Sequence, residues 1–398
     1  MKTLRQSLAA PRRDAWVRLG GWPKGPRILR HQIKETAASL APGDQVAVLD
    51  RNGEHWGWGL YHPESRIRVR MLRQGKEPAN PDWLRERAQA AIRRRAENPE
   101  VDLQADAFRV LHAEGDDFSG LVVDRLGEIL SAEIFTSSAA AVFQDILPTL
   151  HQELGTREHR LMFDTESARA EKEKAFSIHS PGCPPKCQLQ EHGLRYEVTF
   201  AGSHKTGFFC DQRDNRRRFA TLAEGRSVLD VCCYSGGFAL NAARAGAREV
   251  LALDLDEKAL AQAKRNGNLN QLRNLRWVHA DAFSYLRTLT RNERQYEVVM
   301  LDPPKFIHSP KENEEGIARY HDLNKLALQV VAPGGWLVSC SCSGLLPLQE
   351  FRHTIRRAAR SLGRTVRVEK VTGAPPDHPI RLDFPEGEYL KALWMRVD

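Results

Sequence analysis

The fold of this chain is decided by the stretch Ser227-Val228-Leu229-Asp230-Val231-Cys232-Cys233-Tyr234-Ser235-Gly236-Gly237-Phe238-Ala239. It begins as an apolar run typical of a buried strand and then passes through a glycine pair into a run that favours a helix. Glycine lets the backbone approach a ligand closely, and the first turn of a helix presents free N–H groups. The stretch therefore predicts a strand, a turn and a helix that together bind a small ligand.

Acidic residues also end the apolar runs that follow. Asp254 lies 17 residues beyond Gly237, where a carboxylate can accept hydrogen bonds from ribose hydroxyls. Asp281 follows the next run, and Asp302 ends another run directly before two prolines, which cannot continue a strand. A single Asp at the end of a strand is common in ordinary turns. Four such residues in this order, Asp230, Asp254, Asp281 and Asp302, indicate that the carboxyl edge of the predicted sheet binds a ligand. The alternation of strands and helices from about residue 195 predicts a parallel α/β sheet, and the missing Gly-x-Gly-x-x-Gly pattern disfavours NAD.

Two cysteines, Cys340 and Cys342, follow the last of these strands. An accessible thiolate can add to C6 of a pyrimidine and thereby make C5 nucleophilic, so one of them is a candidate nucleophile. The alternative for any single cysteine is a buried, inert thiol. Cys232 and Cys233 lie inside the strand of the ligand turn, and we expect them to pack in the core.

The net charge of +8 is concentrated at one end of the chain. Residues 1–95 hold 20 Lys and Arg against 9 Asp and Glu, and in the whole chain Arg outnumbers Lys by 44 to 15. Guanidinium groups pair with phosphate and stack on bases, so a basic N-terminal module favours a nucleic-acid partner. A solvated basic surface that reflects genome composition is the alternative.

The length of 398 residues predicts two or three domains. We expect a small β-barrel at 1–75, built around the hairpin signal Asn52-Gly53, a middle α+β domain at 76–195 and the α/β domain at 196–398. The seven cysteines are an odd number, and no apolar secretion signal or membrane-spanning run of about 20 residues is evident. These features predict a cytoplasmic protein without disulfides, membrane association or a metal.

Several motifs resemble the bacterial 23S rRNA 5-methylcytosine methyltransferases that carry an N-terminal PUA domain. They are the stretch Lys205-Thr206-Gly207-Phe208-Phe209-Cys210-Asp211-Gln212-Arg213, the stretch Asp302-Pro303-Pro304-Lys305-Phe306, the stretch Ser341-Cys342-Ser343-Gly344 and the closing Pro385-Glu386-Gly387-Glu388-Tyr389-Leu390-Lys391. The likeness covers nearly the whole chain. It implies a class I, Rossmann-like methyltransferase domain, a PUA barrel and a middle α+β domain, with S-adenosyl-L-methionine as cofactor and 23S ribosomal RNA as partner.

The resemblance also implies roles for individual residues. Cys342 corresponds to the nucleophile, with Asp302 as its catalytic partner near the base, and Cys340 is the less favoured thiol. Cofactor-binding roles fall on Asp230, Tyr234, Gly236, Gly237, Asp254, Asp281, Asp302, Phe209 and Asp211, and RNA-binding roles on Lys205, Arg213 and Lys305. Cys210, Cys232 and Asp256 depart from the residues that relatives usually show, which puts the affinity for the cofactor in doubt.

The hypothesis is thus an S-adenosylmethionine-dependent methyltransferase that forms 5-methylcytosine in 23S rRNA through a covalent bond between cysteine and C6. One alternative is methylation of another RNA base atom, such as guanine N7 or N2, without a nucleophilic thiol. Another is a non-catalytic RNA-binding factor of ribosome assembly, and the weakest is an enzyme acting on a small molecule. The sequence does not indicate which nucleotide is methylated, or whether the substrate is naked RNA or an assembled subunit. The base that removes the C5 proton also stays open, with Glu388 as one candidate. The oligomeric state also stays open, with a homodimer as one option.

Overall fold

The computed structural model describes residues 7–102, 105–200 and 206–398, and these residues group into two units. The first unit comprises residues 1–187, 200–210 and 376–387, and the second comprises 188–199, 211–375 and 388–398. The chain therefore passes between the units several times. The predicted domain boundaries after residues 75 and 195 stay predictions.

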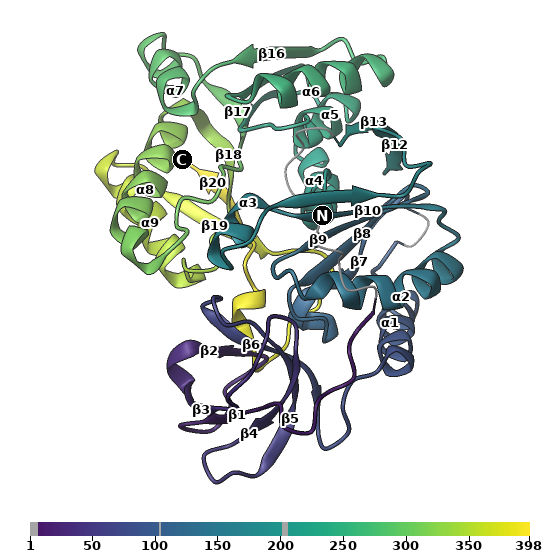
Figure 1. Ribbon diagram of the computed structural model, residues 1–398. Coiled ribbons are helices and arrows are strands. Elements are labelled where there is room, and N and C mark those ends of the chain that lie inside the picture. Colours follow the sequence, from purple (N-terminus) through teal and green to yellow (C-terminus); the bar gives the residue numbers. More distant parts are fainter. Residues whose placement is uncertain (1–6, 103–104, 201–205) are drawn as a thin grey trace. The chain divides into compact units, whose positions relative to one another are not determined.

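The first unit begins with a six-stranded sheet in the order β2-β6-β5-β4-β1-β3 (Figure 1). Its strands are β1 Trp16–Leu19, β2 Arg27–Leu29, β3 Ile33–Thr36, β4 Gln45–Leu49, β5 His55–Tyr61 and β6 Ile67–Gln74. The predicted hairpin is confirmed, because β4 and β5 pair antiparallel across a turn in which Gly53 has a φ of +87°. Asp50 fixes this turn by accepting hydrogen bonds from the backbone N–H groups of Asn52 and Glu54.

The alternation of Arg with apolar residues from Arg66 to Leu72 predicts a half-buried strand with one charged face. The strand is confirmed as β6, but the expected exposure of its charged face is wrong. Arg68 and Arg70 are 9% and 5% exposed. The Arg70 guanidinium instead donates to the carbonyl oxygen of Phe135 and to the Glu114 carboxylate. Burial of these arginines removes them from the surface that could contact a nucleic acid.

The middle of the chain forms a five-stranded sheet in the order β11-β10-β9-β8-β7. Its strands are β7 Ala107–His112, β8 Leu121–Leu126, β9 Ile129–Ile134, β10 Glu158–Phe163 and β11 Phe176–His179. The helices α1 Pro81–Ala96 and α2 Ala139–Leu154 pack on each other and share an apolar core with the sheet, and the short helix α3 spans Thr165–Ala170. Asn80 caps α1 by accepting from the Trp83 N–H group, with Pro81 at the first helical position. This α+β layer matches the predicted middle domain.

The second unit contains a seven-stranded sheet in the order β16-β15-β14-β17-β18-β20-β19. Five neighbouring strands run parallel, and β20 pairs antiparallel with both β18 and β19. The strands are β14 Ser227–Val231, β15 Glu249–Asp254, β16 Leu275–His279, β17 Tyr296–Leu301, β18 Val331–Ser341, β19 Val366–Thr372 and β20 Lys391–Val397. The predicted Rossmann-like α/β domain is confirmed.

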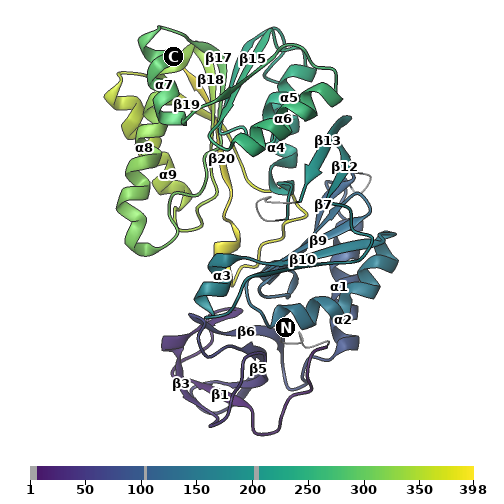
Figure 2. The ribbon, with the colours of Figure 1, turned by 45° about the horizontal axis from the view of Figure 1, so that its top comes forward.

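Helices cover both faces of this sheet, as Figure 2 shows. On one face lie α4 Arg213–Ala220, α5 Gly237–Arg244 and α6 Glu257–Leu269, and on the other lie α7 Ala282–Arg291, α8 Asn313–Val330 and α9 Leu348–Ser361. Each face has its own core of buried side chains, which explains why the strands read as continuous apolar runs. The hairpin of β12 Lys186–Glu191 and β13 Leu194–Thr199 packs beside α6.

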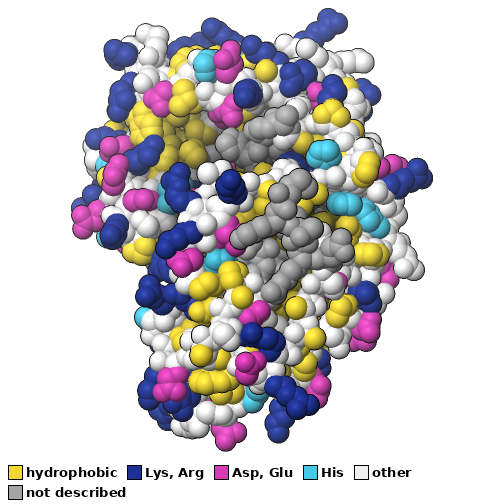
Figure 3. Space-filling view, viewed as in Figure 1, with side chains coloured by type: hydrophobic (Ala, Val, Ile, Leu, Met, Phe, Trp, Pro, Cys, Tyr) yellow, Lys and Arg dark blue, Asp and Glu magenta, His cyan; other side chains and the backbone are white. Residues whose placement is uncertain are grey.

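Among the residues that the structure describes, no helix is both long enough and apolar enough to cross a membrane. Figure 3 shows Lys and Arg side chains spread over the visible surface and intermixed with Asp and Glu.

Candidate functional site

The acidic residues predicted to form a binding edge all lie at the carboxyl ends of parallel strands in the second unit. Asp230 lies near the end of β14, Asp254 ends β15, Asp281 follows β16 and Asp302 follows β17. Because the strands run parallel and in register, these ends meet along one edge of the sheet. Ligands in open α/β sheets bind at this edge.

The turn after β14 is held in an unusual backbone conformation. Cys232, Tyr234 and Gly236 have φ values of 64°, 48° and 86°, in the left-handed region that ordinary side chains disfavour. A Cβ on Gly236 would lie 2.8 Å from the Trp277 ring, so only glycine fits there. The Tyr234 N–H group donates to the Asp254 carboxylate at 2.7 Å, which ties the turn to the end of β15. Strain that neighbouring groups maintain in this way is typical of ligand sites.

The electrostatics of the edge favour a positively charged ligand. Asp230 is fully buried and its pKa is raised to about 8, mainly by burial and to a smaller extent by the charges of Asp302 and Asp254. One Asp230 oxygen accepts from the Ala239 N–H group, while the other has no partner among the described residues. All four carboxylates also raise the pKa of the Cys232 thiol, although burial is the larger cause, so their fields converge on this turn. A cation placed there would relieve the mutual repulsion of the carboxylates.

S-adenosylmethionine fits this edge because its sulfonium and ammonium groups are both cationic. The residues that would hold it are the turn of Tyr234, Gly236 and Gly237, together with Asp254 and Asp281, which follow the two strands beyond it. Asp281 caps α7 by accepting from the Ser284 N–H group with one oxygen. Asp256 caps α6 by accepting from the N–H groups of Lys258 and Ala259, as a hydroxyl residue would.

The two candidate thiols differ in accessibility. Cys340 is fully buried in the sheet, and burial holds its pKa well above the ordinary value. Cys342 lies just beyond the end of β18 and is partly exposed. β18 is the neighbour of β17, so Cys342 and Asp302 follow adjacent strands at the same edge. Cys342 is therefore the thiol that a bound base could reach.

A chain of hydrogen bonds fixes the position of Asp302. Trp394 donates to the Thr372 hydroxyl, which donates to the side-chain oxygen of Asn215. Asn215 donates to the Gln212 amide oxygen, and the Gln212 amide nitrogen then donates to Asp302 at 3.0 Å. This order sets the orientation of the Gln212 amide. Sequence reasoning missed Gln212 as a site residue, although its place between Asp211 and Arg213 in the specific motif was a usable signal.

The other predicted residues occupy different environments. In the second unit, Asp211 accepts a hydrogen bond from the Tyr389 hydroxyl at 2.7 Å, and Lys305 is exposed beside the Asp302 loop. The side chain of Arg213 is only 1% exposed, so its position favours packing over contact with RNA, and its role stays a prediction. Phe209 belongs to the first unit and is partly buried, and Lys205 lies outside the described residues.

The motif that carries Phe209 is anchored in the first unit through Thr206. The Thr206 hydroxyl donates to Asp124 at 2.6 Å, and its carbonyl oxygen accepts from the Ser131 hydroxyl at 2.6 Å. Asp124 also pairs with Arg109, so the anchor is part of a buried polar network. The motif thus has a structural role in addition to the predicted ligand role.

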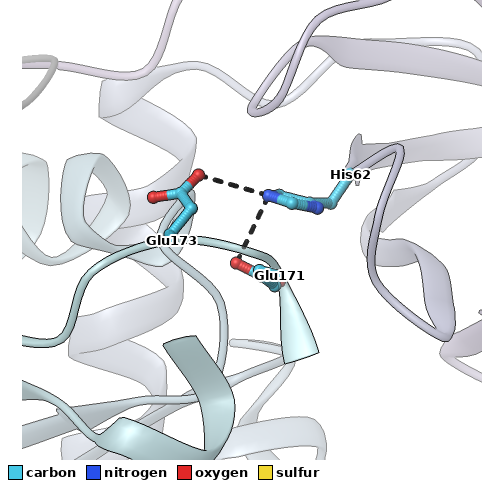
Figure 4. Close-up of side chains that lie close together, drawn as sticks. All are labelled: His62, Glu171 and Glu173. Atoms are coloured by element: carbon cyan, nitrogen blue, oxygen red, sulfur yellow. Dashed lines mark hydrogen bonds and ion pairs between the residues drawn. The ribbon is translucent and has the colours of Figure 1, made fainter. Parts of the chain in front are cut away.

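Among the described residues, the side chains of His62, Glu171 and Glu173 lie close enough together to hold a metal ion (Figure 4). His62 Nε2 lies 3.5 Å from a Glu171 oxygen and 3.3 Å from a Glu173 oxygen. However, His62 Nδ1 accepts hydrogen bonds from the N–H groups of Glu64 and Ser65, so the ring proton sits on Nε2 and points at the carboxylates. A metal ligand needs a free lone pair at that nitrogen, so this cluster is better explained as a hydrogen-bonded link within the first unit.

Comparison with known proteins agrees with this geometry. The strand order, the glycine turn and the acidic strand ends define a class I S-adenosylmethionine-dependent methyltransferase. The sequence model of the S-adenosylmethionine-dependent methyltransferases matches residues 166–396, and that of the PUA-like domains matches residues 24–74.

Relatives of similar length define the family more narrowly. "Ribosomal RNA large subunit methyltransferase I" of Pseudoalteromonas atlantica is 32% identical over 94% of this chain and 95% of its own length. The protein of the same name from Aeromonas hydrophila is 34% identical over 94% of this chain and 95% of its own. "Ribosomal RNA large subunit methyltransferase" of Deinococcus radiodurans is 34% identical over 94% and 93%. The chain belongs to the family of ribosomal RNA large subunit methyltransferase I.

Solved structures share the fold. The methyltransferase SMU.776 in complex with SAH has a TM-score of 0.80 at 19% identity, covering 94% of this chain and 96% of that one. A methyltransferase of Streptococcus mutans has a TM-score of 0.78 at 19% identity, with coverage of 90% and 93%. The predictions of the family, the fold class and the S-adenosylmethionine cofactor are confirmed.

Proposed function

We propose that this enzyme methylates C5 of a cytosine in large-subunit ribosomal RNA, with Cys342 as the nucleophile. The observation that carries the proposal is the partly exposed thiol of Cys342 at the edge of the sheet that holds the acidic strand ends. The names of the relatives support ribosomal RNA as the substrate. The choice of cytosine C5 rests on the position of the thiol and on the resemblance of the motifs.

The reaction follows from the chemistry of the pyrimidine ring. When bound, S-adenosylmethionine would supply an electrophilic methyl group, whose bond to sulfur breaks on transfer and leaves its electron pair with S-adenosylhomocysteine. The Cys342 sulfur forms a bond to C6, and the electron pair of the C5–C6 double bond moves to C5, which takes the methyl group. A base then removes the C5 proton, the double bond forms again and the C6–S bond breaks, which returns the thiolate. Glu388 is exposed next to Tyr389 and is the first candidate to test for this base.

Asp302 is proposed to steady the cytosine near N3. It follows β17 directly, and the prolines that come next hold its loop at the edge of the sheet. Gln212 donates to one Asp302 oxygen, which leaves the carboxylate oriented for contact with a base that has been turned out of its stack. Lys305, exposed in the same loop, is proposed to contact the RNA backbone.

The PUA-like sheet is proposed to bind the RNA backbone and its shape. Trp22 is 56% exposed in this module, and the Arg51 guanidinium lies 5.4 Å from its ring. An exposed aromatic ring beside an arginine offers a surface for base stacking and phosphate contact. Action on ribosomal RNA also implies a cytoplasmic location, which stays a prediction, as do the target nucleotide and the oligomeric state.

The test is transfer of labelled methyl groups to 23S rRNA that lacks this modification, followed by mass mapping of the product. We expect label on a cytosine carbon, loss of transfer of at least 10³-fold in Cys342→Ala, and much smaller loss in the control Cys340→Ala. A covalent adduct with 5-fluorocytosine RNA should form in the wild type and not in Cys342→Ala. Full activity of Cys342→Ala, or label on guanine N7 or N2, would overturn the proposal.

A further inference from the structure

Lys391 is a buried lysine beside the proposed nucleophile. It begins β20 and lies opposite Ser341 in the antiparallel pairing of β20 with β18. Its side chain reaches past the end of β18 and donates a hydrogen bond from Nζ to the carbonyl oxygen of Ser343 at 2.7 Å. The residue is only 4% exposed, so its amine is held next to the backbone that follows Cys342.

This position requires a physical explanation, because burial of an ammonium group is unfavourable unless its charge is compensated. An ammonium has three donors, and the Ser343 carbonyl is the acceptor that Lys391 has among the described residues. No described Asp or Glu lies within ion-pair distance of its nitrogen. The remaining donors are therefore available to an anion that forms at this site.

The charged groups that face Lys391 identify that anion. The pKa of Lys391 is lowered to about 8, mainly by burial. The Cys342 thiolate and the Glu388 carboxylate oppose this decrease, and the Lys305 charge adds a little to it. Glu388 is exposed, so solvent screens its charge. Cys342 is partly buried, and its sulfur gains a negative charge whenever it becomes reactive.

We propose that Lys391 is a positioning residue that stabilises the thiolate form of Cys342. The inference rests on the proposed function, because a thiolate matters there only if Cys342 is the nucleophile. Below its own pKa the amine is already an ammonium, so the thiol proton leaves to solvent and the new thiolate lies beside a positive charge. The hydrogen bond to the Ser343 carbonyl keeps that charge in place, and it also holds the turn that carries Cys342.

Tyr320 supports the same turn through the Ser343 side chain. Its hydroxyl lies 2.9 Å from the Ser343 hydroxyl, and both side chains are fully buried. The turn after β18 is thus fixed at the Ser343 side chain by α8 and at the Ser343 carbonyl by β20. Tyr320 is neutral, so replacing it by Phe removes a support of the turn without removing a positive charge. Tyr320→Phe is therefore the matched control for Lys391.

The test is the rate at which iodoacetamide alkylates Cys342 as a function of pH, followed on the Cys342 peptide by mass spectrometry. In the wild type we expect the midpoint to lie below the ordinary thiol pKa of about 8.5. In Lys391→Met it should rise by about one unit, which is about a tenfold lower rate at pH 7. Lys391→Arg, which keeps the charge, should restore most of the shift, and Tyr320→Phe should leave the midpoint unchanged.

A wild-type midpoint at or above 8.5 overturns the inference even if no variant folds. It is also overturned if Lys391→Met and the wild type share one midpoint, or if Tyr320→Phe shifts it as much as Lys391→Met does. Alkylation needs no RNA and no methyl transfer, so it separates this inference from the proposed function. A shifted midpoint together with a fully active Cys342→Ala would contradict the function and leave the influence of Lys391 on the thiol intact.

Discussion

In the first unit, buried arginines lie against carboxylates, whereas the carboxylates at the sheet edge of the second unit lie near one another. Arg95 is 2% exposed and donates to Asp116 and to the carbonyl oxygen of Asp377, both at 2.7 Å. Asp230 and Asp254 form no ion pair with any cation in the described part of the chain, and their charges oppose each other. Paired charges of this kind hold a fold together, while like charges kept close together leave room for a cationic ligand.

The largest effect is expected from breaking a pair in the first unit. Arg95→Met removes the buried one of the two arginines that contact the fully buried Asp116 and should lower the free energy of unfolding by about 3–5 kcal/mol. Urea denaturation followed by circular dichroism measures this change. Arg94→Met is the control, since Arg94 also contacts Asp116 but its side chain is 45% exposed, and it should cost about 1 kcal/mol or less. Equal losses in the two variants would contradict the distinction between buried pairs and surface pairs.

At the sheet edge of the second unit, we expect a substitution to raise the free energy of unfolding, not to lower it. Asp230→Asn keeps an oxygen for the Ala239 N–H group and removes a buried acid, so the protein without ligand should gain about 1–3 kcal/mol at pH 8. The folded state holds the Asp230 proton up to a pKa of about 8, while the unfolded chain loses it near 3.9. Stability of the wild type should therefore fall as pH rises from about 4 to about 8.

Denaturant midpoints of the two proteins across this range measure the effect. The difference between them should grow with pH and become constant above about pH 8. If Asp230→Asn is less stable than the wild type at pH 8, the buried Asp230 carboxylate does not destabilise the folded protein, and the contrast between the two units fails.

A smaller effect is expected in the binding of the cofactor. A cation favours ionised carboxylates, so the affinity for S-adenosylmethionine should rise by about tenfold from pH 7 to pH 9, with release of a proton from Asp230. Calorimetry in buffers with different ionisation enthalpies counts the protons released. Asp230→Asn should bind more weakly and without this pH dependence. Identical pH profiles of the affinity in the two proteins would mean that ionisation of Asp230 is not coupled to binding of S-adenosylmethionine.

The smallest effect concerns the surface of the first unit, where cations are not all paired with acids. Trp22→Ala removes the exposed ring beside Arg51 and should weaken binding to ribosomal RNA fragments by about fivefold, which is about 1 kcal/mol. Fluorescence anisotropy at fixed salt measures the affinity. Leu382→Ala is the control, because Leu382 in the same unit is also exposed but has no π-face. A similar loss in both variants would mean that stacking is not involved.

Sequence reasoning worked well where one local pattern determines the structure. The glycine turn, the order of Asp230, Asp254, Asp281 and Asp302, and the Asn52-Gly53 hairpin follow from backbone preferences that neighbouring residues set. It failed for the exposure of Arg68 and Arg70, because alternation along a strand cannot show that Arg70 pairs with Glu114, more than 40 positions away, or that Arg68 donates to the carbonyl oxygen of His62.

The same limit explains the residues that were missed in the site. The orientation of Gln212 depends on Asn215, Thr372 and Trp394, which lie in three separate parts of the chain. Lys391 was visible in a motif, but its burial beside Ser343 depends on the pairing of β20 with β18. Side chains whose role depends on long-range contacts cannot be assigned from local spacing.

The segment 376–387 has a consequence for how the protein is made. Although it lies near the C-terminus, it belongs to the first unit, where the Asp377 carboxylate accepts from the Arg109 N–H group and its carbonyl oxygen accepts from Arg95. Domains usually fold in order as they leave the ribosome. Here the buried guanidinium groups of the first unit find all their acceptors only after residues 376–387 have been translated, and these residues follow most of the second unit in the sequence. The first unit therefore cannot complete its folding before most of the second unit has been made.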